Sequence, residues 1–383
     1  AMSGSGYFLK NGSNTLTLTG THTFTGTTVV NAGTLLVGAG STAGSMSSAS
    51  NVYLPFSTAN YSVSRSDNLS MGAVVKGVGV FEKLGGNTLT LTGSSLNAVF
   101  KIDGGTLVAE NDVPSVTSSN FSGPGALTIQ SAGTSFSSAF TMPSATFGST
   151  LGGLTIGKTT NSVNATIGSA VSIAGPITVY GSNIHVNSNL TSTLASAPIL
   201  LKASGTISVG TGIGLQTKNG SLILWSNSAG STTAGGITLG DSVTINTANG
   251  STSQTTGGGS ITMGGGTATT TDSAGNTVPS GAASSSTSYG IIFGTNSDGN
   301  TTDTVYTGGG NLTLTGYSSK AVANNGGVVF ARKNDIKTGA GNVTITGTTT
   351  GDWNGIELTT FGASGSTFSL VSAGIITLTG TGG

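Results

Sequence analysis

Asn14-Thr-Leu-Thr-Leu-Thr-Gly20 is the stretch of this sequence that decides the fold. Its core, Leu-Thr-Leu-Thr-Gly, recurs at Leu89–Gly93 and Leu312–Gly316, and Val343–Gly347 and Ile376–Gly380 are close variants. Aliphatic residues alternate with threonine, which is the pattern of a β-strand with one packed face and one solvated face. Such a short strand cannot bury its apolar face alone, so its recurrence predicts strands stacked in successive rungs.

The composition indicates an ordered all-β chain and excludes several kinds of partner. The 383 residues include 65 glycines, 35% are hydrophobic and only 6% are charged. Alternating Val, Ile and Leu runs throughout the chain distinguish it from a flexible linker. Twelve basic and twelve acidic residues are scattered singly, which argues against binding to nucleic acid or to an anionic membrane. No apolar run reaches the roughly 18–20 residues needed to cross a bilayer.

Residues 7–110 contain two long copies of one unit. The Leu-Thr-Leu-Thr runs begin at Leu16 and Leu89, and Gly-Thr-Leu follows at Gly33 and Gly105, so order and spacing are kept. The unit resembles the autotransporter-associated β-strand repeat of bacterial passenger regions. That resemblance implies a right-handed parallel β-helix on a cell surface, whereas the periodicity alone predicts stacked strands.

The remaining residues divide into three further regions. Residues 1–6 are interpreted as a cloning remnant or linker, and the chain as a segment of a longer protein. Residues 111–150 are expected to form transition coils whose aromatic residues stack inside the coil or cover a seam: Phe121, Phe136, Phe140 and Phe147. Residues 151–383 contain short strands bounded by Gly or Asn, and the last hundred residues carry a two-part repeat. This region resembles the β-helix of filamentous-haemagglutinin-type exoproteins and adhesins.

Two stretches are predicted to be loops extruded from the solenoid. Thr247–Thr287 has few large apolar residues, and Asn296–Thr307 is rich in small polar ones. We therefore expect deletion of Asn249–Ser286 to leave the fold intact. Loops on a rigid scaffold are where specific recognition is expected, and the turn Asp352–Asn354 adds a tryptophan that could stack on a sugar ring. Trp353, Asp352 and Asn354 are therefore the candidate ligand contacts.

The sequence does not predict a catalytic or cofactor site. Its carboxylates do not fall in pairs on one strand, so the convergent acids of a glycosidase are not visible. His22 and His185 lack a second histidine at ligand spacing. The stretch from Asn296 to Asp303 is similar to an oxygen-rich calcium loop but lacks the downstream glutamate, so a plain Asp-Gly turn is the preferred interpretation. We expect neither enzyme activity nor a cofactor.

Together these features predict a structural or adhesive segment of a large secreted or surface-anchored bacterial exoprotein. Such an elongated, non-catalytic scaffold would serve as an adhesin, or in a biofilm or the cell-surface matrix. The expected partner is a cell-surface or matrix component, either a glycan or neighbouring exoprotein copies, without nucleic acid and without membrane insertion by this segment. The location is expected to be extracellular or outer-membrane-associated. Two alternatives stay open: a carbohydrate-binding or polysaccharide-processing β-helix, and a self-assembling surface-layer protein.

Overall fold

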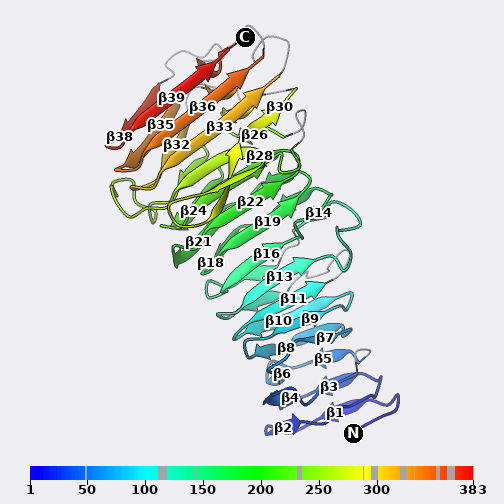
Figure 1. Ribbon diagram of the computed structural model, residues 1–383. Coiled ribbons are helices and arrows are strands. Elements are labelled where there is room, and N and C mark those ends of the chain that lie inside the picture. Colours follow the sequence, from blue (N-terminus) through cyan, green and yellow to red (C-terminus); the bar gives the residue numbers. More distant parts are fainter. Residues whose placement is uncertain are drawn as a thin grey trace. The chain divides into compact units, whose positions relative to one another are not determined.

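The computed structural model describes residues 1–47, 50–110, 119–142, 145–230, 235–287, 289–294, 301–319, 326–331, 333–350, 354–359 and 367–382. Within those ranges all regular structure is β-strand, and the strands stack in parallel, as Figure 1 shows. The expected fold class, an all-β parallel β-helix, is confirmed. The chain forms two compact units, residues 1–158 with 173–175 and residues 159–172 with 176–383.

The first unit is built from short strands separated by tight corners. They are β1 (Phe8–Lys10), β2 (Thr15–Leu18), β3 (Thr28–Val30), β4 (Gly33–Ser41), β5 (Val52–Leu54), β6 (Ala59–Arg65), β7 (Leu69–Met71), β8 (Val75–Leu84), β9 (Thr88–Leu91), β10 (Leu96–Ile102), β11 (Thr106–Glu110), β12 (Asn120–Ser122), β13 (Ala126–Gln130), β14 (Phe140–Thr141), β15 (Thr146–Phe147) and β16 (Gly153–Ile156). One sheet runs β1-β3-β5-β8-β10-β12-β15, and a second runs β7-β9-β11-β13-β16. The strands β2, β4 and β6 join the first sheet through β8, which is long enough to pair with both β5 and β6.

Parallel pairing in register places like residues above one another in the core of this unit. Leu89, Leu107, Leu127 and Leu154 occupy one position of four successive strands, and each is buried. A second ladder is aromatic: Tyr61, Phe81, Phe100, Phe121 and Phe147, with neighbouring ring centroids 5.0–6.1 Å apart. The prediction that aromatics of the transition region stack inside the coil is confirmed for Phe121 and Phe147, and Phe136 stacks on Phe140 at 4.7 Å.

The corners of the two predicted copies are built alike. Gly33 and Gly105 both have positive φ, +67° and +61°, and a Cβ there would lie 2.5 Å or less from backbone atoms of the preceding coil. Only glycine fits such a position. Lys10 is the last residue of β1 and Lys83 the last but one of β8, and both ammonium groups donate to carbonyl oxygens of two successive turns.

The second unit has three sheets along its coils. Its strands are β17 (Ala165–Ile167), β18 (Val171–Ile173, whose last residue is grouped with the first unit), β19 (Ile177–Gly181), β20 (Ile184–Val186), β21 (Leu190–Ala195), β22 (Ile199–Ala203), β23 (Ile207–Val209), β24 (Gly214–Lys218), β25 (Leu222–Ser226), β26 (Ile237–Leu239), β27 (Thr244–Asn246), β28 (Ile261–Thr271), β29 (Thr277–Gly281), β30 (Ala283–Ser285), β31 (Ile291–Phe293), β32 (Thr302–Tyr306), β33 (Leu312–Ser318), β34 (Val328–Ala331), β35 (Lys333–Gly339), β36 (Val343–Thr349), β37 (Ile356–Thr359), β38 (Phe368–Ser372) and β39 (Ile376–Thr381). The three sheets run β19-β22-β25-β28-β33-β36-β39, β17-β20-β23-β26-β31-β34-β37 and β18-β21-β24-β27-β32-β35-β38.

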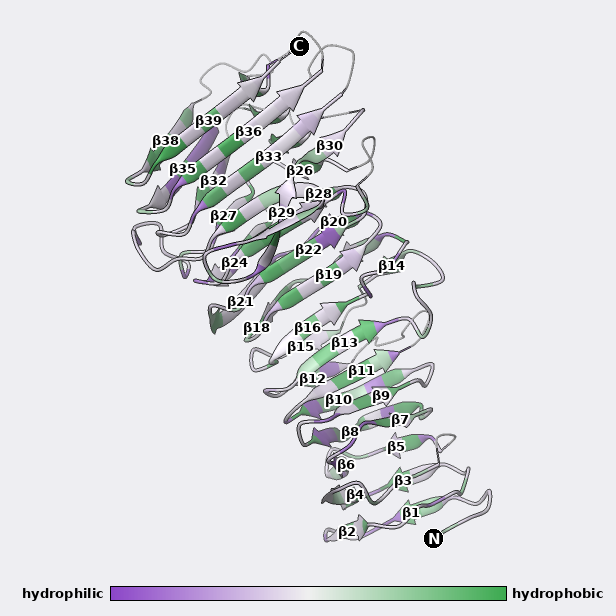
Figure 2. Ribbon diagram, viewed as in Figure 1, coloured by the Kyte–Doolittle hydropathy of each residue, from purple (hydrophilic) through white to green (hydrophobic). Residues whose placement is uncertain are grey.

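The repeated motif supplies an aliphatic ladder to the first of these sheets. One register position is occupied in turn by Ile177, Ile199, Leu222, Ile261, Leu312, Val343 and Ile376. The alternation of apolar and polar residues along the strands is visible in Figure 2. Two aliphatic residues of the repeated motif are exposed where the stack ends. Leu16 on β2 and Ile376 on β39 are 40% and 43% exposed, because each strand is paired on one side only.

The predicted loop Thr247–Thr287 is only partly a loop. Residues 248–260 have no regular structure, but Ile261 and Met263 on β28 are fully buried between β25 and β33. After Gly265 the same strand leaves the stack and returns as β29 in an antiparallel hairpin. Deleting Asn249–Ser286 would remove one core strand, so the expected tolerance of that deletion is wrong. Of the second predicted loop, residues 302–306 form β32, and Asn296–Asn300 lie outside the described residues.

Candidate functional site: a walled groove on the second unit

The hairpin of β28 and β29 folds back onto the outer face of its own sheet. Val278 packs against Ile223 and Trp225, with Leu200 at the edge of this apolar cluster. The Trp225 indole Nε1 donates to the Gly266 carbonyl at 2.8 Å, and the Lys202 ammonium lies 3.6 Å from the ring centroid. Trp225 is 4% exposed, so it anchors the hairpin.

The hairpin tip is fixed by polar contacts as well. Asp272 accepts backbone hydrogen bonds from Ala274 and Asn276, which closes the turn. The Asn276 amide also reaches Ser221 at 3.2 Å, and the hydroxyls of Ser260 and Ser273 lie 3.1 Å apart. Contacts at both its base and its tip therefore hold the hairpin in one position on the sheet.

A groove of about 360 Å³ lies between this hairpin and the neighbouring strands. Its floor is the outward face of three adjacent strands, where Thr262, Thr313 and Thr344 stand in register. Its remaining lining comes from β28, β29, the turn between them and the strand starts: Ser260, Thr270, Thr271, Asp272, Ser273, Val278, Pro279, Ser280, Asn311 and Thr315. The volume is within the range of small-ligand sites.

The chemistry of this groove is that of hydroxyl groups around one carboxylate. Burial acts to raise the pKa of Asp272, but hydrogen bonds from Ser221, Asn276 and the turn amides outweigh it and hold that pKa below its usual value. Asp272 is therefore ionised at neutral pH. Threonine and serine hydroxyls both donate and accept hydrogen bonds, so the groove matches a neutral ligand rich in hydroxyl groups.

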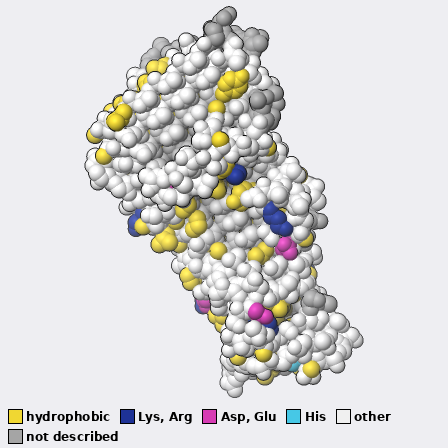
Figure 3. Space-filling view, viewed as in Figure 1, with side chains coloured by type: hydrophobic (Ala, Val, Ile, Leu, Met, Phe, Trp, Pro, Cys, Tyr) yellow, Lys and Arg dark blue, Asp and Glu magenta, His cyan; other side chains and the backbone are white. Residues whose placement is uncertain are grey.

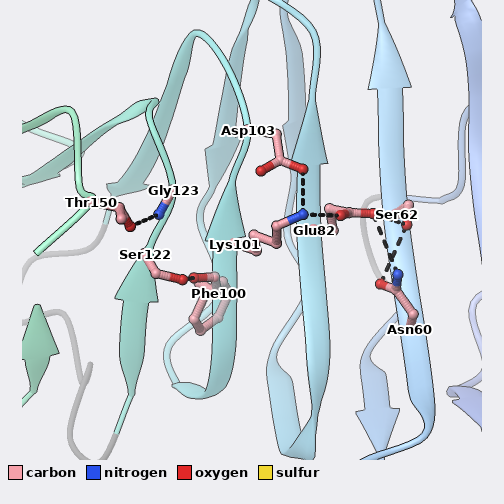
Figure 4. Close-up of polar contacts among 9 residues, drawn as sticks. All are labelled: Asn60, Ser62, Glu82, Phe100, Lys101, Asp103, Ser122, Gly123 and Thr150. Carbon is pink, nitrogen blue, oxygen red and sulfur yellow. Dashed lines mark hydrogen bonds and ion pairs between the residues drawn. The ribbon is translucent and has the colours of Figure 1, made fainter. Parts of the chain in front are cut away.

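The first unit carries a network of charged side chains, shown in Figure 4. The Lys101 ammonium lies 3.0 Å from Glu82 and 2.8 Å from Asp103, and Glu82 also accepts hydrogen bonds from Ser62 and Asn60. Burial acts to raise the pKa of Glu82, but the bonds from Lys101, Ser62 and Asn60 lower it overall. Because Glu82 is an ionised, saturated acceptor, it is unsuited to donate a proton as a general acid.

The predicted contact residues fall mostly outside the described part of the chain. Asp352 and Trp353 are among the residues that the structure does not describe, and Asn354 is exposed and does not line the groove. The histidines are far apart in the sequence and contact different partners. His22 Nδ1 accepts the Met2 amide at 3.1 Å, and burial lowers the pKa of His22. His185 Nδ1 lies 2.7 Å from the Ser208 hydroxyl.

Sequence reasoning expected recognition in the loop Thr247–Thr287, but it missed the groove because it did not predict that part of this stretch forms a hairpin. The signals were present: Val278-Pro279 is an apolar pair in an otherwise polar stretch, and Asp272 with Gly275 marks a turn between two threonine-rich runs. What the sequence does not specify is the direction in which the hairpin folds. That direction depends on Ile223 and Trp225, which lie about forty to fifty-five residues earlier in the chain.

Residues 8–37 match the family model of the passenger-associated transport repeat. This segment spans β1 to most of β4 and includes both Lys10 and Gly33. The match supports the autotransporter part of the predicted resemblance, and such a repeat is consistent with the passenger region of a secreted or cell-surface protein. The resemblance of residues 151–383 to filamentous haemagglutinin stays a prediction.

Further comparisons add no relatives. Neither a curated protein nor a solved structure matches the chain. Among the described residues, no helix is long and apolar enough to span a membrane.

Proposed function

We propose that this chain is a non-catalytic adhesive scaffold within the passenger region of a bacterial surface exoprotein. The observation that carries the proposal is a passenger-type repeat at the start of a solenoid whose outward faces are ladders of threonine. The face visible in Figure 3 consists mostly of uncharged polar side chains and backbone, with few charged groups. Such a surface is soluble, and it offers many weak, repeated hydrogen-bonding sites to a surface or matrix partner.

The partner we propose is a neutral glycan of the cell surface or matrix, and the groove is its contact. Three threonines in register on adjacent strands are spaced about 4.8 Å apart, and the fixed hairpin beside them adds hydroxyls and one carboxylate. A single groove of this kind binds weakly, but many copies on a surface increase the apparent affinity through multivalency.

The test uses the purified chain coupled to fluorescent beads and applied to bacterial cells, matrix extracts and a panel of neutral glycans. Wild-type beads are expected to bind at least one of these surfaces. Thr313→Val and Thr344→Val together remove two hydroxyls without loss of volume, and they should lower binding severalfold. Thr155→Val on β16 is the matched control, because Thr155 is a half-buried strand threonine away from the groove. No binding by wild-type beads contradicts the proposal.

Two other results would assign the chain to a different class. Release of reducing sugars from a polysaccharide, lost on substitution of one acidic residue, would make it a polysaccharide-processing enzyme. Ordered two-dimensional arrays of the purified chain in electron micrographs would make it a surface-layer type of protein.

A further inference from the structure

The threonines on the groove floor belong to two longer rows on the same face of the sheet. Both rows cross successive strands in register, and β28, β33, β36 and β39 follow one another along the stack, as Figure 1 shows. The first row is Thr262, Thr313, Thr344 and Thr377, and the second is Thr315, Thr346 and Thr379. We call these two rows the threonine track.

The hairpin of β28 and β29 closes one end of the threonine track. On the preceding strand of the stack, β25, the two outward positions are occupied by Ile223 and Trp225. They are 2% and 4% exposed, because Val278 of the hairpin packs against both. The second outward position on β28 is Gly264, and Pro279 lies 3.5 Å from the point that a Cβ would occupy there. A ligand lying on the track therefore cannot continue past β28.

Exposure along the first row changes in the same direction. Thr262, beside the hairpin, is 5% exposed. Thr313 and Thr344 are half-buried, and Thr377 is exposed. The threonine track is therefore blocked at the hairpin and accessible on β33, β36 and β39.

The wall and one long edge of the threonine track carry polar groups that are held in place. Thr271 and Ser280 on the hairpin are exposed and line the groove. At the strand starts, Asn311 Oδ1 accepts the Asn342 backbone N–H at 2.9 Å, and Asn342 Oδ1 accepts that of Ile375 at 2.9 Å. Because these elements are fixed before a ligand arrives, binding loses little entropy in ordering them.

We infer that the threonine track binds the end of a linear, neutral glycan, with the chain crossing the strands and its terminal sugar against the hairpin. The inference rests on the proposed glycan-binding function and adds the orientation of the chain. Successive strands lie about 4.8 Å apart, close to the length of one sugar ring, so successive sugars meet successive threonines. Hydroxyls on both sides donate and accept hydrogen bonds. Asp272, the charged residue in the groove lining, repels acidic sugars, which favours a neutral chain.

The test is calorimetric titration of the whole chain with linear oligosaccharides of two to six sugars. The probes are the cello-, laminari-, malto- and N-acetylchito-oligosaccharides. At least one series is expected to bind, with affinity rising severalfold per added sugar up to about four sugars, one for each strand of the track, and with no further gain beyond. At equal mass of sugar, the parent polysaccharide should compete less well than its hexasaccharide, because it has fewer chain ends.

Variants locate the chain on the threonine track. Thr377→Val with Thr379→Val removes two exposed hydroxyls on β39, the strand of the track farthest from the hairpin. This double variant should weaken binding of the hexasaccharide severalfold and leave that of the trisaccharide unchanged, because a trisaccharide against the hairpin extends to β36. Thr178→Val is the matched control. Thr178 is half-buried on β19, in the same sheet but beyond the hairpin, so this variant should bind every length like the wild type.

The outcomes separate this inference from the proposed function. Equal affinity for all lengths, equal competition by polysaccharide and hexasaccharide, or weaker binding in Thr178→Val would overturn binding of the chain end and leave a glycan-binding groove standing. No binding of any series by the wild type would overturn both. The length series requires no substitution, so it decides the inference even if the double variant fails to fold.

Discussion

Replacing Phe100 by alanine is expected to destabilise the first unit more than other single truncations there. Phe100 is fully buried, and its ring lies 5.5 Å from that of Phe81 and 5.0 Å from that of Phe121. Truncation of a buried Phe to Ala costs about 3–5 kcal/mol, and the cost rises when the cavity cannot collapse. Backbone pairing of β10 with β8 and β12 fixes the coils above and below. We therefore expect a loss of about 4–5 kcal/mol in the free energy of unfolding.

Hydrogen exchange measured by mass spectrometry at increasing urea concentration is the suitable assay, because it reports the stability of each strand separately. In Phe100→Ala, the opening free energy measured from the amides of β8, β10 and β12 should be lower than in the wild type by about 4–5 kcal/mol. Phe56→Ala is the matched control, since Phe56 is 55% exposed and should change stability by no more than about 0.5 kcal/mol. A loss below about 1 kcal/mol for Phe100→Ala, or equal losses for the two variants, would refute the aromatic core.

Three further outcomes are expected. Deleting Asn249–Ser286 should abolish cooperative unfolding of the second unit in circular dichroism melts. Replacing only Thr267–Pro279 by Asn-Gly should preserve cooperative unfolding, and equal melts of the two variants would contradict the position of β28 in the core. Burial lowers the pKa of Lys83 to about 8, against about 10.4 in an unfolded chain. Between those values the unfolded chain binds more protons, so urea titrations should show stability rising with pH, and Lys83→Met should remove that rise. Burial raises the pKa of the Tyr61 hydroxyl. Above about pH 10 only the unfolded chain therefore loses this proton, and the free energy of unfolding should fall. Tyr61→Phe should weaken that fall, and the same dependence of stability on pH in both proteins would contradict the burial of the hydroxyl.

The strand pattern could be predicted from sequence because it depends on local alternation. Leu89 and Leu91 are both buried and Thr90 between them is not, as period-two alternation requires. Burial that depends on the neighbouring coil was harder to predict from the sequence. Leu16 has the same local pattern as Leu89, yet it is exposed because its strand is paired on one side only. Local pattern specifies which face a residue is on, and only the stack specifies whether that face is covered.

The groove could not be predicted from the sequence for a related reason. In the sequence, Val278 is an isolated apolar residue in a polar stretch. Its role is visible only in the structure, where it packs against Trp225 from another coil. Contacts between coils depend on the number of residues in each turn of the β-helix. Loops of unequal length vary that number, so the contacts cannot be derived from a fixed repeat length.

Register between coils is the central claim, and cysteine cross-linking measures it most directly. The natural chain has no cysteine, so introduced pairs give an unambiguous signal. Thr313 and Thr344 are paired in register on β33 and β36, and neighbouring strands lie about 4.8 Å apart, within the Cα separation that a disulfide allows. Thr313→Cys with Thr344→Cys should therefore form a disulfide on mild oxidation, and Thr313→Cys with Thr346→Cys should not. Cross-linking of the second pair but not of the first would contradict the stacked, in-register β-helix.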